Sequence, residues 1–293
     1  MHPSREAVLG AAGAAAAPSA IALPASAPRR RIALVTEYYH PHVGGIPEHV
    51  RHFAREARRR GHVVHVITSH LPGGEQSPDI VRIGESVTVR ANGSLARLTV
   101  GRGLRTAMRR ALRRGHYDVV HVHAPLAPSL PMLAIEEARC PVVGTFHAYF
   151  EFSVAYAFGR RYFQRLMDRL DAAIAVSAAA RDATARYFHA DWTIIPNGVD
   201  TTVFEPGAPP PALLGDGVPT VLFVGRFDSR NGLPALIEAF RLLRVGGRRA
   251  RLLVVGDGPQ RDRYHRLAAG DPDIVFAGHV PSGLPGYYAG STV

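Results

Sequence analysis

Glycine-containing turns follow several apolar segments of strand length, and a helical pattern comes after each turn. Gly44 and Gly45 follow the first such segment, Gly225 ends a later one, and Gly256 and Gly258 follow the next. Glycine lets a backbone approach a ligand closely, and the free N–H groups at a helix start attract anions. The dinucleotide fingerprint G-x-G-x-x-G and the phosphate loop G-x-x-x-x-G-K are both absent. The turns therefore predict phosphate contact, with plain strand-to-helix turns as the alternative.

The segments that carry these turns alternate with helical patterns along most of the chain. Because a strand–helix–strand unit requires parallel strands and a right-handed crossover, we predict open, doubly wound α/β sheets with helices on both faces. The predicted strands are 31–36, 63–68, 118–123, 141–146, 172–177, 193–196, 220–225, 251–256 and 273–278. The predicted helices are 46–60, 103–114, 129–138, 160–170, 178–188, 233–245, 259–268 and 283–289.

Composition divides the chain into four regions. Residues 1–28 are rich in Ala, Pro and Ser, which predicts a disordered extension, with an export signal as the alternative. Residues 29–204 form a first α/β domain, and the Pro/Gly-rich residues 205–219 form a linker. Residues 220–293 form a second α/β domain that holds few strands and is expected to be incomplete. Because ligands of open α/β sheets bind beyond the carboxyl ends of the strands, the glycine turns of both domains are expected to face a shared cleft.

Composition also restricts the class of protein. The 293 residues are 46% hydrophobic and 20% charged, which is typical of globular domains, and no apolar run is long enough to span a bilayer. The single cysteine, Cys140, excludes a disulfide framework and fits a reducing compartment. The net charge of +11 rests on 35 basic residues, all of them arginine. Such a charge favours an anionic partner: a phosphorylated substrate, a lipid surface or nucleic acid.

A basic helix is the strongest candidate for contact with an anionic surface. Seven arginines and no acid lie from Arg97 to Arg114, and apolar side chains share one face of the helix predicted over 103–114. An amphipathic basic helix is typical of membrane-surface binding, and the alternative is a solvated helix packed on the sheet. Nucleic acid is not expected, because zinc and RNA-recognition motifs are absent. The predicted membrane-surface residues are Arg105, Arg109, Arg110, Arg113 and Arg114.

Histidine is abundant, with 15 residues, which leaves a histidine-based metal site open in principle. His121 and His123 alternate on the strand predicted over 118–123, so their side chains point to one face of the sheet. We interpret both as polar residues of the core and sheet edge. This interpretation predicts no metal site at His121 and His123.

The order of several motifs resembles that of glycosyltransferase family 4, whose members have the GT-B fold. The first motif is TEYYHPHVGGIPEHVRHFAREARRRGHVVHVIT, and GTFHAYF, IPNGVDTTVF, FVGRFDSRNG and VVGDGP follow in the family's order. A narrower likeness, to phosphatidylinositol mannosyltransferase-like members, rests on ANGSLARLTVG and APLAPSLPMLAI. The resemblance runs from about residue 31 to the end. It implies two Rossmann-like domains facing a cleft, and sugar transfer from a nucleotide donor with retention, without a metal or other cofactor.

The resemblance also implies roles for single residues. Arg226, in GRFDSRNG, would neutralise the leaving diphosphate, and His147, in TFH, would contact the donor sugar, so both are predicted catalytic residues. The family carries lysine where this chain has Asn231, and we hypothesise that Arg230 substitutes for it. The predicted donor-binding residues are Gly44, Gly45, Gly225, Arg230, Asn231, Gly256, Gly258 and Val280. The predicted acceptor-binding residues are Asn92 and His147.

These features together predict a retaining glycosyltransferase that moves mannose or a similar hexose from GDP- or UDP-hexose to a lipid or glycan acceptor. It would act in the cytoplasm, peripherally on the anionic inner face of the plasma membrane. The acidic E-x7-E motif of relatives would lie beyond residue 293, so the alternative is a catalytically impaired fragment that binds a lipid or a partner protein. A Rossmann-type oxidoreductase is disfavoured, because Thr68-Ser69-His70 stands where an acid would follow the second strand.

Overall fold

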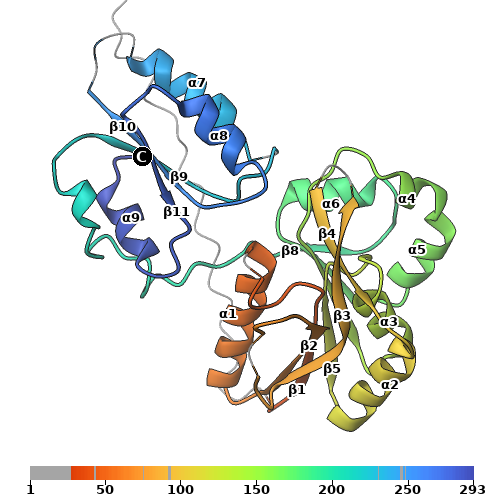
Figure 1. Ribbon diagram of the computed structural model, residues 1–293. Helices are drawn as coiled ribbons and strands as arrows, with labels where there is room; N and C mark the ends of the chain where they lie inside the picture. The colour runs from red at the N-terminus through yellow and green to blue at the C-terminus, as the bar shows by residue number, and fades with distance from the viewer. Residues whose placement is uncertain are drawn as a thin grey trace, which may run out of the picture.

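Two separate β-sheets organise the chain (Figure 1). The structure is a computed structural model that describes residues 28–42, 44–74, 76–91, 94–229, 231–244, 247 and 249–293. The first sheet has the order β4-β3-β2-β1-β5-β6-β7-β8 and the second the order β11-β10-β9. The strands of the first sheet are β1 (Arg31–Val35), β2 (Val63–His70), β3 (Ile80–Ala91), β4 (Ser94–Val100), β5 (Val119–His123), β6 (Val142–Phe146), β7 (Ala172–Ala175) and β8 (Trp192–Ile194). Those of the second are β9 (Thr220–Val224), β10 (Arg251–Val255) and β11 (Ile274–Gly278).

Helices connect the strands and cover the sheets. Those of the first unit are α1 (Gly45–Arg59), α2 (Leu104–Gly115), α3 (Leu130–Glu137), α4 (Val154–Phe158), α5 (Arg160–Met167) and α6 (Ala178–Ala185). A short 3-10 helix, η1 (Ala212–Leu214), lies between the sheets in sequence. Those of the second unit are α7 (Leu233–Arg244), α8 (Arg261–Ala268) and α9 (Leu284–Gly290).

Apolar residues of β1 alternate between the two hydrophobic cores that lie on opposite faces of the first sheet. Ile32 and Leu34 belong to the core cluster that includes Val50 and other α1 residues. Ala33 and Val35 belong to the cluster on the opposite face, which α2 and α3 cover (Figure 1). A strand with both faces apolar suits the centre of a parallel sheet, because helices then exclude water from both sides.

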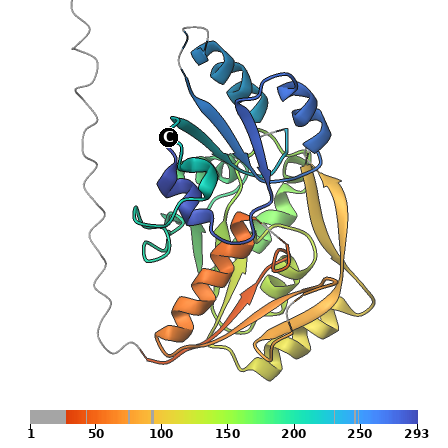
Figure 2. The same ribbon diagram turned by 60° about the vertical axis from the view of Figure 1, so that its left-hand side comes forward.

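The second sheet is also covered on both sides. Both views place α7 and α8 on one side of its strands and α9 on the other (Figure 2). Ile237 and Phe240 of α7 pack with Tyr264 of α8 and with Leu252 of β10 in one buried cluster. Each unit therefore has its own core, as expected for Rossmann-like units.

The predicted α/β fold with two Rossmann-like sheets is confirmed, with one main difference. Strands β3 and β4 were not predicted, and they form an antiparallel hairpin at the edge of an otherwise parallel sheet. The helix predicted over 160–170 begins at Arg160 as α5 but ends at Met167, and the short helix α4 before it was not predicted. The extension predicted over 1–28 lies outside the described residues except for Pro28, and the domain limits at 204 and 220 stay predictions.

The last residues of the chain continue the second sheet. Val293 donates its N–H to the carbonyl oxygen of Thr220 at 3.3 Å, and its own carbonyl accepts from Leu222 at 2.7 Å. This is the hydrogen-bond pattern of a parallel pair along the free side of β9.

Helix α9 packs tightly against the segment that joins the two sheets. A Cβ added to Gly286 would lie 2.0 Å from the carbonyl oxygen of Pro209, and the rings of Phe204 and Tyr288 contact edge to face at 5.7 Å. The joining segment is therefore held to the second unit by backbone contact as well as by aromatic side chains.

We predict that Gly286→Ala destabilises the protein, because the added methyl group overlaps a backbone atom that cannot move freely. We expect the free energy of unfolding to fall by about 1–3 kcal/mol, measured by urea denaturation. Gly207→Ala, in the same segment, is the control, because no described atom lies within 4 Å of its added Cβ. Equal stability of the two variants would contradict this packing.

Candidate active site

The carboxyl ends of the parallel strands form the candidate site. β1 pairs in parallel with β5, and β5 with β6, so the residues that follow these strands lie at one edge of the sheet. Glu37 follows β1, His123 ends β5 and His147 follows β6. Side chains that are far apart in sequence are thereby brought together.

A buried carboxyl group, that of Glu37, ties this edge to two other elements. One oxygen accepts the backbone N–H of Leu130 at 2.7 Å, and the other accepts the hydroxyl of Thr99 at 2.5 Å. Burial raises the pKa of Glu37 to about 7, although both hydrogen bonds oppose the rise. Glu37 was not singled out by the sequence, yet it joins the end of β1 to the hairpin strand β4 and to the start of α3.

Three histidine side chains meet at the same edge: His49 from α1, His123 from β5 and His147 from the loop after β6. Nδ1 of His123 lies 3.0 Å from Nε2 of His147, and the rings of His49 and His147 meet edge to face with centroids 5.1 Å apart. His121, next along β5, stacks on His123 and lies 2.7 Å from the Thr145 hydroxyl. The predicted catalytic residue His147 is therefore part of a cluster.

All three histidines of the cluster are neutral at pH 7. Burial, reinforced by the neighbouring histidines, lowers the pKa of His147 to about 3 and that of His123 well below its usual value. Burial also lowers the pKa of His49, which a hydrogen bond with Asn197 partly opposes. A neutral imidazole donates or accepts a hydrogen bond without adding charge, which suits contact with a sugar hydroxyl.

A second cluster connects the two sheets. Nε of Arg97, on β4, donates to Nδ1 of His42, in the loop after β1, at 3.3 Å. Burial, together with the guanidinium groups of Arg97 and Arg226, lowers the pKa of His42 to about 4. Arg226 follows β9, so a cation of the second sheet faces a loop of the first. The sequence identified Arg226 but neither Arg97 nor His42, and together they form a positive surface suited to an anion.

The glycines after β9 and β10 have a packing role. A Cβ on Gly256 would lie 1.9 Å from the carbonyl oxygen of Gly225, and one on Gly258 would lie 2.8 Å from backbone atoms of Phe227. The φ angles of Gly256 and Gly258, 140° and 159°, are also ones that other residues rarely adopt. Close contact between the two turns thus requires glycine with or without a ligand. A pocket of about 190 Å³ beside these turns is lined by Gly256, Arg261 and other residues.

The turn before α1 differs, because it contains open space. A Cβ on Gly45 would meet no described atom within 4 Å, and one on Gly44 would meet only the Pro47 ring, at 3.7 Å. Packing therefore does not require glycine at either position. The open space lies at the start of α1, where backbone N–H groups attract anions.

The remaining predicted site residues are three that would bind the donor nucleotide and one that would bind the acceptor. Nδ2 of Asn231 donates to the carbonyl oxygen of Arg226 at 2.6 Å, so one of its two amide N–H groups already stabilises the turn. Val280 lies half-buried in the turn after β11. Arg230 and Asn92 lie outside the described residues.

Helix α2 is basic, but two of its arginines pair with acids. Arg105 contacts both Glu136 and Glu137 at the end of α3, the latter at 2.8 Å, and Arg109 contacts Glu137 at 2.6 Å. Their charges are therefore largely offset within the protein. The other predicted membrane-surface arginines are exposed and have no ion pair among the described residues: Arg110, Arg113 and Arg114.

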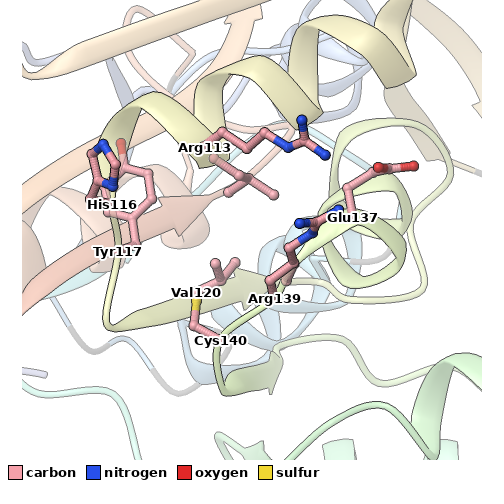
Figure 3. A pocket seen from close by; sticks show the side chains of 9 residues that line it. Arg113, His116, Tyr117, Val120, Glu137, Arg139 and Cys140 are labelled. Carbon is pink, nitrogen blue, oxygen red and sulfur yellow. The ribbon is translucent and has the colours of Figure 1, made fainter.

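A larger cavity, of about 440 Å³, lies at the amino ends of β5 and β6, away from the candidate site. Arg113 of α2 and Arg139 and Cys140 of the turn before β6 line it (Figure 3). Burial raises the pKa of the Cys140 thiol, which makes it a poor nucleophile. Among the described residues, no helix has the length and apolar character required to cross a bilayer.

Sequence comparison places this site in a known family. Residues 43–203 match the sequence profile of Glycosyltransferase Family 4, and residues 218–293 match that of glycosyl transferases group 1. The chain belongs to glycosyltransferase family 4 and has the GT-B fold.

Individual relatives agree with this assignment. The chain is 35% identical to the phosphatidyl-myo-inositol mannosyltransferase of Mycolicibacterium smegmatis over 85% of its own length and 63% of the relative's. For the protein of the same name from Mycobacterium tuberculosis, the values are 34%, 85% and 66%. The chain thus spans slightly less than two thirds of these relatives. Anabaena HepE, in complex with UDP-glucose, has the same fold with a TM-score of 0.62, at 17% identity over 90% of this chain and 72% of HepE.

The raised pKa of Glu37 predicts a pH dependence of stability. Because the folded protein holds the Glu37 proton up to about pH 7, while the unfolded chain loses it near 4.5, this contribution is complete below pH 4.5 and is lost as the pH rises through 7. Relative to the wild type, Glu37→Gln should remove a fall of up to about 1.4 kcal/mol per pH unit in that window. Urea midpoints at pH 5, 6, 7 and 8 measure the difference. The exposed Glu205→Gln is the control, and parallel pH profiles of wild type and Glu37→Gln would contradict the prediction.

Proposed function

We propose that this chain transfers a hexose, with retention, from a nucleoside diphosphate sugar to a membrane lipid acceptor. The observation that carries the proposal is the pair of guanidinium groups, Arg97 from the first sheet and Arg226 from the second, that face the neutral His42. Two guanidinium groups between the sheets are best suited to bind a diphosphate. Membership of glycosyltransferase family 4 supports the same reaction class.

Breaking the bond between the sugar and the diphosphate leaves negative charge on a phosphate oxygen. Arg226 stabilises that charge by charge-assisted hydrogen bonds, and the free N–H groups at Gly45 and the start of α1 contribute from the other side. Because His42 stays neutral, it can donate a hydrogen bond to the same phosphates without a change in charge. No metal ion is needed for this step in the proposed mechanism, because arginine supplies the positive charge.

The sugar then lies over the histidine cluster. His147 is neutral and half-buried, so it contacts a sugar hydroxyl near the reacting carbon and leaves the charge balance to the arginines. In this proposal the donor nucleotide lies over the turns after β9, β10 and β11, and the sugar lies over the first sheet. Residues 29–204 would then bind the acceptor and residues 220–293 the nucleotide, joined by 205–219.

The relatives suggest the identity of the substrates. The name phosphatidyl-myo-inositol mannosyltransferase supports mannose as the sugar and a phospholipid as the acceptor, and HepE binds UDP-glucose. We therefore propose GDP- or UDP-hexose as the donor. A lipid acceptor requires contact with the membrane, which the exposed arginines of α2 provide on the inner, anionic face of the plasma membrane.

A second function is favoured by Asn231. It stands where the family has lysine, and its amide bonds a backbone carbonyl, so the leaving diphosphate loses one cation. In this alternative the chain binds a lipid or a partner protein without transferring sugar. Assays of sugar transfer and of donor hydrolysis distinguish the two, because an inert chain that still binds vesicles would support the alternative.

We predict that Arg226→Ala reduces transfer about 100-fold or more, because the diphosphate loses its main cation from the second sheet. Release of GDP or UDP from the sugar nucleotide, with and without a lipid acceptor, measures the effect. Arg263→Ala is the matched control, since Arg263 is exposed on α8 of the same unit. Full activity of Arg226→Ala would refute the proposed function.

The vesicle-binding surface is tested by Arg110→Gln/Arg114→Gln. Each arginine near an anionic leaflet contributes about 1 kcal/mol, so the double variant should bind phosphatidylserine vesicles about 30-fold more weakly in a sedimentation assay. Arg263→Gln/Arg266→Gln removes the same net charge from α8 and should have a much smaller effect. Equal losses would show that net charge, and not α2, governs binding.

A further inference from the structure

The three clustered histidines have the geometry of a metal site. The ring centroids of His49, His123 and His147 form a nearly equilateral triangle, with sides of 5.4, 5.3 and 5.1 Å. One ligand nitrogen from each lies within 4.8 Å of the others. A tetrahedral ion with metal–nitrogen distances of about 2.0–2.1 Å would hold three imidazole centroids roughly 5 Å apart. The rings already have this spacing.

The cluster also lacks partners for its polar atoms. Nε2 of His123 is fully buried and has no hydrogen-bond partner among the described residues. Nδ1 of His123 and Nε2 of His147 lie 3.0 Å apart, so they share one proton at most. One fully buried nitrogen of the cluster, Nε2 of His123, therefore has no described partner, and the contact between His123 and His147 is a hydrogen bond that a bound cation would replace.

The surroundings hold the ligands in place as the outer contacts of a metal site do. Asn197 hydrogen-bonds His49, and His121 stacks on His123 with centroids 4.4 Å apart. His49 and His147 are each only partly buried, so the cluster is open to solvent on one side. Ions can therefore reach the cluster from solvent.

We propose that His49, His123 and His147 bind one divalent transition-metal ion of the Zn²⁺ class. Three neutral imidazoles favour Zn²⁺, Ni²⁺ and Cu²⁺ over Mg²⁺ or Ca²⁺, which prefer oxygen ligands. The bound ion is coordinated by the lone pair of His147. In the proposed function, that lone pair is available to a hydroxyl of the donor sugar. On that proposed function, the ion is an inhibitor that competes with the sugar nucleotide and takes no part in transfer.

Cobalt titration of the full chain tests the site, because Co²⁺ replaces Zn²⁺ and its visible absorption reports tetrahedral coordination. We expect one equivalent of Co²⁺ to bind with this absorption and to be displaced by Zn²⁺. His49→Ala and His147→Ala, at partly buried positions, should each weaken binding at least about tenfold. His189→Ala is the matched control, because its side chain is exposed and remote in sequence from the cluster. Circular dichroism verifies that the variants fold.

Two outcomes would overturn the site: no tetrahedral absorption in the wild type, or equal binding by His49→Ala and His189→Ala. Either could occur in a chain that transfers sugar normally, so failure here is distinct from failure of the proposed function. A chain that binds Co²⁺ through these histidines but transfers no sugar would keep the metal site and refute the transferase. Zn²⁺ that leaves transfer unchanged while bound would refute only the competition.

Discussion

Parallel pairing of β1, β5 and β6 is the constraint on which the site depends. The register sets Val122 opposite both Val35 and Gly144, so the strands end together and their next residues meet. Glu37, His123 and His147 therefore converge from widely separated parts of the chain. Helix α1 starts at the same edge and adds His49. The buried carboxyl group of Glu37 then fixes β4 and the start of α3 around them.

Charge is divided within the site according to burial. Burial and the neighbouring histidines strongly disfavour the protonated form of the clustered histidines. The cluster is therefore uncharged. The permanent charges of Arg97 and Arg226 act instead on His42, in the loop after β1. A nucleoside diphosphate sugar has the matching pattern, with a neutral polar ring joined to an anionic diphosphate.

The sequence predicted the alternation of strands and helices because apolar runs and glycine turns are local signals. It missed β3 and β4, although Val81, Ile83, Val87 and Val89 alternate with polar residues and indicate a strand exposed on one face. The contact between Arg97 and His42 joins residues 55 apart, so no local pattern reveals it. The same limit applies to Arg105, whose partners belong to another helix.

The uncharged state of the histidine cluster has two chemical consequences, and these compete with each other. An uncharged imidazole suits a sugar hydroxyl, and three of them with ligand nitrogens within 4.8 Å of one another also suit a metal ion. A charged cluster would exclude the ion by repulsion but would also disturb the charge balance beside the diphosphate. Because Arg226 and Arg97 already supply positive charge, the cluster needs no cation for the proposed reaction. The same burial that keeps His147 suited to a sugar therefore leaves it open to a competing ion.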